Sequence, residues 1–262
     1  MMYEEFADFC FQLRQTGEIA DQVPPHLQSI SLADGYAIQD KLVAKLLAAH
    51  GGRKIGYKIG CTSKGAQDLL NTDKPVYGQM LSAWQHQSPV TLSAADFSMR
   101  VIEPEFAFTL AADVPEGDYD VEKIRPFIHN VIPCIEIVHH HLAGWHCFNA
   151  NILAADNTIH GAWIAGEATT DWQDLDFPHH QVTLYTNDTV VSAGEGSIVL
   201  GNPLNALAWL ANTLPQHGHQ LKAGDVVTTG VCMPVYTAQV GERLRAEFGS
   251  LGEVRVAFSS FS

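Results

Sequence analysis

The segment RVIEPEFAFTL (residues 100–110) most constrains how the chain folds, because charged and apolar residues alternate in it as they do in a β-strand. Alternate side chains of a strand share a face, so Glu103 and Glu105 point the same way and the other face is apolar. Pro104 between them removes a ladder hydrogen bond, which favours a sheet edge or a bulge. Two neighbouring carboxylates repel when ionised, so this face is either solvated or binds a hard cation such as Mg²⁺, Mn²⁺ or Ca²⁺.

A third glutamate lies in a second predicted strand, IPCIEIVHHH (residues 132–141). Glu136 there has apolar neighbours, and an unpaired buried charge is very costly, so it needs a metal, an arginine or a surface position. The histidines that follow invite a zinc hypothesis, but only His139 and His141 share a strand face, and HExxH and the usual Cys/His spacings are absent. We therefore expect a solvated or hydrogen-bonded histidine cluster at this position.

A lysine is the third candidate, in the segment GYKIGCTS (residues 56–63). Lys58 lies between two glycines with few charges nearby, and a lysine with restricted solvation can have a lowered pKa and move protons. The alternative is a surface lysine, and Lys54 in RKIG repeats the same local pattern. The motifs GxxxxGK, GxSxG and a full GxGxxG are absent, so phosphate loops, serine-hydrolase elbows and dinucleotide sites receive no support.

The rest of the chain predicts a mixed α/β fold in which strands dominate. Helices are expected within residues 3–15, from a capping box at Ser31 and Asp34 to a stop at Gly51, after Ser63, near 120–131 and near 203–213. Strands are expected near 100–110, 133–138, 161–166, 181–186, 225–230, 243–248 and 253–258, the last two as a terminal hairpin. A soft boundary is expected near residues 80–95, which are polar and irregular.

Composition narrows the function classes. The chain has 262 residues and a net charge of -14, so its surface repels phosphate backbones and a nucleic-acid partner is not expected. Five scattered cysteines without a C-x-x-C pair favour free thiols in a reducing cytoplasm. The acidic start is unlike a signal peptide, and no run approaches the roughly 20 apolar residues of a membrane helix, so we expect a soluble cytoplasmic protein without a membrane partner.

Seven segments taken together resemble the fumarylacetoacetate hydrolase superfamily, and more closely its branch of 2-keto-4-pentenoate hydratases and 4-oxalocrotonate decarboxylases. They occur in family order from about residue 50 to the end: GYKIGCTSK, KPVYG, IEPEFAF, IPCIEIV, NILAADNTIHGAWIAGE, VLGNPLNALAWLAN and LKAGDVVTTG. The resemblance implies a rolled β-sheet core, a homo-oligomer, and a Mg²⁺ or Mn²⁺ ion held by Glu103, Glu105 and Glu136. It also implies a catalytic role for Lys58, because Lys58 occupies the position of the family's catalytic lysine. Lys54 precedes the matching segment, so the resemblance implies no such role for it.

We expect a helical region with the lysine loop over residues 1–85 and a β-roll catalytic domain over residues 86–262. Thr62, Ser63 and Asp156 are candidate polar contacts to substrate or to the loop, although Asp156 with Asn157 also fits a turn. Two positions depart from the hydratase pattern: Val76 stands where hydratases commonly carry an acid, and His139 where many relatives carry Asp.

The resemblance implies a metal-dependent lyase on a small 2-oxo or 2-hydroxy-dienoic acid, most closely a hydratase. The ion would chelate the C1 and C2 oxygens and stabilise an enolate, with Lys58 moving a proton and residue 76 facing C4–C5. One alternative is a 4-oxalocrotonate-type decarboxylase, because the apolar residue at 76 resembles either the decarboxylases or an uncharacterised hydratase-like branch. Others are an acylpyruvate C–C hydrolase, with a base among His139, His140, His141 and His160, and a non-enzymatic metal-dependent dicarboxylate binder.

Overall fold

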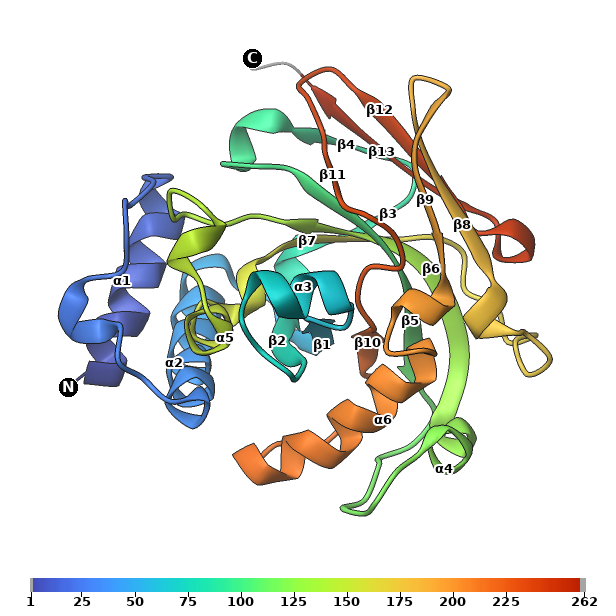
Figure 1. Cartoon of the computed structure of the whole chain (residues 1–262), viewed down its shortest axis with the longest axis horizontal. Helices are drawn as coiled ribbons and strands as arrows, with labels where there is room; N and C mark the ends of the chain where they lie inside the picture. Colours follow the sequence, from blue (N-terminus) through green and yellow to red (C-terminus); the bar gives the residue numbers. More distant parts are fainter. Residues whose placement is uncertain (1, 260–262) are drawn as a thin grey trace.

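The computed structural model describes residues 2–259, which form two curled β-sheets flanked by helices (Figure 1). The helices are α1 (Met2–Thr16), α2 (Leu32–His50), α3 (Lys64–Leu69), α4 (Val121–Ile124), α5 (Ala150–Ala155) and α6 (Pro203–Thr213). The strands are β1 (Lys54–Gly60), β2 (Val76–Leu81), β3 (Gln85–Gln87), β4 (Val90–Ser93), β5 (Val101–Leu110), β6 (Ile128–Val138), β7 (His160–Ala165), β8 (Gln181–Thr186), β9 (Thr189–Glu195), β10 (Val226–Thr228), β11 (Tyr236–Thr237), β12 (Arg243–Glu247) and β13 (Glu253–Ser259).

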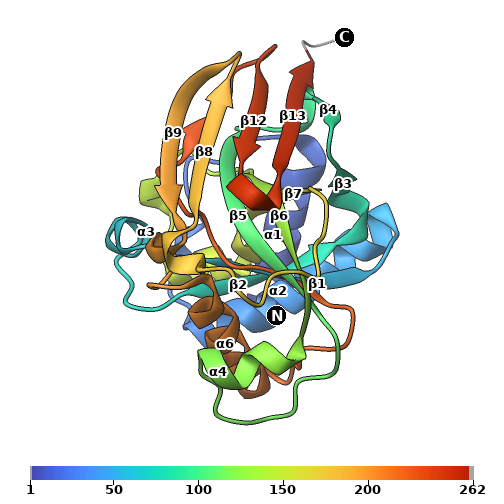
Figure 2. The same ribbon diagram turned by 90° about the vertical axis from the view of Figure 1, so that its right-hand side faces the viewer.

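The larger sheet has the strand order β2-β1-β10-β5-β6-β7-β3, with β11 also paired to β5. The smaller sheet has the order β4-β13-β12-β8-β9, and Figure 2 shows its strands side by side. An apolar core lies between the sheets, where Phe106 of β5 packs edge-on against Phe248 and Phe177. Strands β5 and β6 are thus interior strands, which explains their near-continuous apolar sequences.

The N-terminal helices cover one end of the larger sheet. Helix α2 begins at a capping box formed by Ser31 and Asp34 and ends before Gly51, as the sequence predicts. Helices α1, α2 and α5 bury a second apolar cluster that includes Phe6, Leu42 and Ile152. Figure 1 shows these helices grouped on the side of the molecule away from the smaller sheet.

Most predicted elements are confirmed to within a few residues, including the terminal hairpin of β12 and β13. The helix predicted near 120–131 is present but shorter than expected: α4 ends at Ile124, a short 3₁₀ turn contains Pro126, and β6 begins at Ile128. Proline removes the backbone donor that a longer helix would need, and the apolar residues that follow enter the sheet. The irregular segment near 80–95 contains β3 and β4, which the sequence did not indicate.

Strands from both predicted regions share the larger sheet, because β2 pairs with β1, β1 pairs with β10, and β10 pairs with β5. The division between residues 85 and 86 stays a prediction. Among the described helices, the structure contains none with the length and apolar character needed to cross a membrane.

Candidate active site

The three predicted glutamates come together at the centre of the larger sheet. Glu103 of β5 lies directly opposite Glu136 of β6 in the strand register, and Glu105 lies two residues further along β5. One carboxylate oxygen from each residue lies within 4.8 Å of those of the other two. Glu105 and Glu136 are fully buried, whereas Glu103 is partly exposed. The acidic face of β5 is therefore not a solvated surface.

Pro104 does not mark a sheet edge, so the edge alternative of that expectation is wrong. Strand β5 has partners on both sides, but its partner on one side changes from β10 to β11 across the proline. The carbonyl of Pro104 accepts the backbone N–H of Cys232, which lies in the segment between these two short strands. A missing donor is tolerated here because the regular ladder is interrupted at this point.

Lys58 and His160 both contact the same carboxylate. Lys58 Nζ lies 3.0 Å from Glu136 Oε1, and His160 Nδ1 lies 2.9 Å from the same oxygen. All three side chains are almost completely buried. Lys54, the sequence twin of Lys58, instead donates to the hydroxyl of Tyr57 over 2.8 Å. The structure therefore assigns Lys58, and not Lys54, to the glutamate cluster.

The burial of these charges shifts their pKa values strongly. Burial raises the pKa of Glu103 to about 7, and burial together with repulsion from Glu136 raises the pKa of Glu105. Burial opposes ionisation of Glu136, but Lys58 and His160 outweigh it and lower the pKa of that carboxyl. Burial also disfavours charged Lys58, yet the three glutamates outweigh this effect and raise its pKa, so the expectation of a lowered pKa is wrong.

The donor set fits a hard divalent cation. Oε1 of Glu105 and Oε2 of Glu136 are buried and make no hydrogen bond to the described residues. A buried carboxylate oxygen without a partner is costly, and three converging carboxylates exceed the charge of one lysine. Carboxylate oxygens are the ligands that Mg²⁺, Mn²⁺ and Ca²⁺ prefer.

A pocket of about 420 Å³ opens over this cluster. Its charged lining residues, among those described, are Lys58 and Glu103, and most of the remaining wall is apolar. Val76 is fully buried at the start of β2 and is not among the lining residues, which gives no support for its placement over C4–C5. The neutral lining residues are Gly60, Cys61, Ser63, Gly65, Ala66, Leu69, Leu70, Val101, Val138, Trp145, Leu153, Thr158, Ile159, Val231, Met233, Pro234 and Val235.

The three predicted polar contacts occupy different environments. Ser63 lines the pocket and caps α3, its hydroxyl accepting the N–H of Ala66 over 3.2 Å. Thr62 is buried against Gly230, and Asp156 is buried in an ion pair of 2.9 Å with Arg14. Neither Thr62 nor Asp156 is among the pocket-lining residues, so their contact with substrate stays a prediction.

The histidine cluster is hydrogen-bonded, as expected. The Nε2 atoms of His139 and His141 lie 2.9 Å apart, and the ring of His139 packs edge-on against Phe97. Burial lowers the pKa of His139 to about 2 and that of His141 to about 3. Both rings are therefore neutral at physiological pH, and neither lines the pocket.

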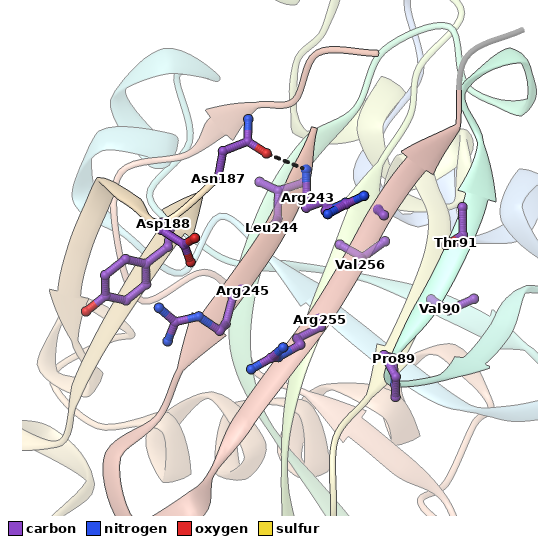
Figure 3. Close-up of a pocket in the computed structure, with 12 residues that line it drawn as sticks. Pro89, Val90, Thr91, Asn187, Asp188, Arg243, Leu244, Arg245, Arg255 and Val256 are labelled. Carbon is purple, nitrogen blue, oxygen red and sulfur yellow. Dashed lines mark hydrogen bonds between the residues drawn. The ribbon is translucent and has the colours of Figure 1, made fainter. Parts of the chain in front are cut away.

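A second hollow lies on the outer face of the smaller sheet (Figure 3). Three arginines of β12 and β13 line it, but Arg245 pairs with Glu247 and stacks 4.1 Å from the ring of Tyr185, while Arg255 pairs with Glu253. None of the glutamate cluster contributes to this hollow.

Sequence reasoning missed the contact between His160 and Glu136, and the contribution of Thr158 and Ile159 to the pocket. These residues follow Asp156 in a turn where Asn157, Thr158 and Ile159 all have φ near +50°. Thr and Ile rarely adopt this conformation, so these two residues do not signal the turn. The Asp156-Asn157 pair is the local signal that the sequence offers for it.

Comparisons with known proteins agree with this architecture. The family profile described as "Fumarylacetoacetate (FAA) hydrolase C-terminal" matches residues 61–259. The chain is 32% identical to 2-hydroxyhexa-2,4-dienoate hydratase of Comamonas testosteroni, over 94% of this chain and 93% of that protein. It is 28% identical to 2-keto-4-pentenoate hydratase of Paraburkholderia xenovorans (strain LB400), over 98% and 95% of the two chains.

Solved structures share the fold. The 4-oxalocrotonate decarboxylase from Pseudomonas putida G7, complexed with magnesium and adipate, superposes with a TM-score of 0.91 at 22% identity and covers 98% of this chain and 97% of its own. Fumarylpyruvate hydrolase from Pseudomonas aeruginosa, in complex with Mn²⁺ and pyruvate, has a TM-score of 0.61 at 15% identity, covering 80% and 91%. The mixed α/β fold with a rolled sheet core is thereby confirmed, and the chain belongs to the fumarylacetoacetate hydrolase family.

Proposed function

We propose that this chain is a metal-dependent hydro-lyase that adds water to a small 2-hydroxy-dienoic acid, in the manner of a 2-keto-4-pentenoate hydratase. The observation that carries the proposal is the cluster of three glutamates and Lys58 at the base of a pocket that is otherwise almost uncharged. Relatives at about 30% identity over nearly the whole chain are hydratases, which supports the same reaction class.

Glu103, Glu105 and Glu136 are proposed to hold Mg²⁺ or Mn²⁺. Related structures contain magnesium, calcium or Mn²⁺, which supports a divalent ion. When bound there, such an ion would supply Lewis-acid stabilisation of the negative charge that develops on the 2-oxo acid, an effect worth several kcal/mol.

Lys58 is proposed to transfer the protons. Among the described lining residues, it is the one basic side chain that faces the pocket, and its Nζ is held 3.0 Å from Glu136. It would protonate C5 of the dienol and assist addition of water at C4. A positioned acid or base of this kind contributes about 10² to 10⁴ in rate. Ser63 at the start of α3 is proposed as a polar contact to the substrate.

The pocket lining favours a hydratase over a 4-oxalocrotonate decarboxylase. That decarboxylase substrate carries a second carboxylate, which needs a positive partner when it is buried. Lys58 is the one cation among the described lining residues, and it is already paired with Glu136. Leu69, Trp145 and Val235 instead suit an uncharged hydrocarbon tail.

An acylpyruvate hydrolase is less well supported, because it needs a base that activates water. Nδ1 of His160 is occupied by Glu136, and neither His139, His140 nor His141 is among the lining residues. A metal-dependent binder without activity would also fit the glutamates, but it would not require a buried lysine among them. Self-association into a homo-oligomer stays part of the proposal.

The test follows loss of the diene absorbance of 2-hydroxypenta-2,4-dienoate and formation of 4-hydroxy-2-oxopentanoate, with Mg²⁺ and with EDTA. 4-Oxalocrotonate and an acylpyruvate are assayed in parallel, and spontaneous ketonisation is measured without protein. We expect metal-dependent hydration that Glu105→Gln abolishes. Turnover of 4-oxalocrotonate or the acylpyruvate alone would contradict the proposed reaction, and oxalate binding without any turnover would identify a binder.

Oxalate binding measured by calorimetry tests the metal site separately, because oxalate mimics the planar pyruvate enolate. Binding that requires Mg²⁺ in the wild type and is lost in Glu105→Gln would support the site. Equal binding with and without Mg²⁺ would contradict it.

A further inference from the structure

Helix α1 lies outside residues 61–259, which match the family profile, yet one of its side chains contacts the segment that supplies Thr158 and Ile159 to the pocket wall. The side chain of Arg14 is 7% exposed and donates four hydrogen bonds, all to one short segment. Its Nε and Nη2 bind Asp156 Oδ1 at 3.0 and 2.9 Å, Nη2 also binds the Asp156 carbonyl at 3.0 Å, and Nη1 binds the His160 carbonyl at 3.1 Å. The guanidinium therefore joins both ends of residues 156–160, named here the Asp156–His160 turn.

The Asp156–His160 turn has a backbone that its own residues do not favour. Asn157, Thr158 and Ile159 have φ of 50°, 50° and 49°, three consecutive residues in the left-handed region. Asn tolerates this region, but Thr and Ile are β-branched and rarely adopt it. Such a conformation persists when surrounding contacts hold it in place.

A second set of contacts holds the middle of the turn. Asn157 accepts the backbone N–H of Gln79 over 2.7 Å and donates to the Gln79 carbonyl over 2.9 Å. Gly60 and Gly78 provide the space: a Cβ at Gly78 would lie 2.5 Å from the Asn157 carbonyl oxygen, and one at Gly60 would lie 2.9 Å from Thr158 Cγ2. The turn is thus pressed against β1 and β2, which carry Lys58 and its neighbours.

The same turn supplies three groups to the active site. Thr158 and Ile159 line the pocket, and His160 places Nδ1 at 2.9 Å from Glu136 Oε1. That oxygen also contacts Lys58. A shift of the turn would therefore move a pocket wall and one of the two groups that orient Glu136, without breaking the pairing of β5 with β6.

We propose that Arg14 is a positioning residue: it fastens the strained Asp156–His160 turn so that His160 and the Thr158–Ile159 wall keep their places at the catalytic centre. The proposal rests on the proposed function for its kinetic consequences. Asp156 then has a structural role, because it accepts the hydrogen bonds of Arg14. Helix α1 in turn contributes to the geometry of the active site.

The test compares Arg14→Met, Arg14→Lys and a matched control, Phe6→Leu. Phe6 is a fully buried residue of the same helix and makes no hydrogen bond to the turn, so this variant reports general loss of helix packing. Hydrogen exchange of the peptide covering residues 156–161 is measured first, in protein without added metal or substrate. We expect faster exchange there in Arg14→Met, partial protection in Arg14→Lys, and wild-type protection in Phe6→Leu.

The kinetic arm measures kcat and KM for 2-hydroxypenta-2,4-dienoate and calorimetric binding of oxalate with Mg²⁺. Because misplacement of a catalytic group by about 1 Å can cost about 100-fold, we expect kcat to fall by roughly tenfold or more in Arg14→Met. Oxalate binding should change by less than about threefold, since strand register places the glutamates. Arg14→Lys should recover part of kcat.

Wild-type exchange at residues 156–161 in Arg14→Met, or an equal loss of protection in Phe6→Leu, would overturn the proposal. If Arg14→Met does not fold, Arg14→Lys and Asp156→Asn are measured in its place, and unchanged exchange in both has the same meaning. Failure of the wild type to hydrate the dienoate would refute the proposed function, while the exchange measurement would still decide the role of Arg14.

Discussion

The histidine pair at the end of β6, in which His141 is buried and His139 is partly exposed, predicts a defined loss of stability in mild acid. His139 and His141 have folded-state pKa values lowered by burial to about 2 and about 3, against an ordinary value of 6.5. A lowered histidine pKa means that the unfolded chain binds protons below pH 6.5 while the folded chain does not, so stability present above pH 6.5 is lost as the pH falls. At pH 5.5 each histidine costs about 1.4 kcal/mol, or about 2.8 kcal/mol for the pair.

Replacing one ring isolates this effect from the other acid-sensitive groups. We expect His141→Gln to lose about 1.4 kcal/mol less unfolding free energy than the wild type between pH 7.5 and pH 5.5. The measurement is urea denaturation followed by tryptophan fluorescence at both pH values. His26→Gln serves as control, because its side chain is 61% exposed. Identical losses in wild type and His141→Gln would refute the assignment of acid sensitivity to this pair.

Three further predictions concern the active site and its packing. Lys58→Met should lower kcat for the dienoate by about 10² to 10⁴ while keeping Mg²⁺-dependent oxalate binding, and a loss below about tenfold would remove Lys58 from proton transfer. Glu103→Gln should raise the melting temperature in EDTA, because it removes a carboxylate whose pKa is raised to about 7 by burial. The same variant should abolish the stabilisation of the fold by Mg²⁺. A lower melting temperature of the variant in EDTA would contradict this reasoning. Gly78→Ala should destabilise the fold by about 1 to 3 kcal/mol because its Cβ would meet the Asn157 carbonyl at 2.5 Å, whereas Gly65→Ala, with open space, should be nearly neutral in the same denaturation assay.

The sequence predicted the parts of the site that depend on local periodicity. Glu103 and Glu105 are two residues apart on a strand, so their shared face follows from the chain itself. Glu136 could be recognised as out of place in an apolar strand, but its position opposite Glu103 depends on the register between β5 and β6. Register is set by the packing of the whole sheet, and the family resemblance supplied it where the residues alone could not.

The parts that escaped prediction are long-range. Arg14 contacts a carboxylate 142 positions later in the chain, and neither residue carries a local signal of the other. The contact of His160 with Glu136 has no local signal either, because it joins β7 to β6 across the sheet. The raised pKa of Lys58 also depends on three carboxylates that converge only in the folded protein, which explains why its local sequence suggested the opposite shift.

The placement of the charged groups on interior strands has a consequence for how such an enzyme can diversify. Glu103, Glu136 and Lys58 lie on strands fixed by pairing on both sides, while much of the pocket rim comes from α3 and from residues 231–235, outside the sheet. Substitutions at the rim can change which substrate tail is admitted without disturbing the ladder that aligns the charges. Selection for a new substrate can thus act on one set of residues while the charged groups on the sheet are inherited unchanged.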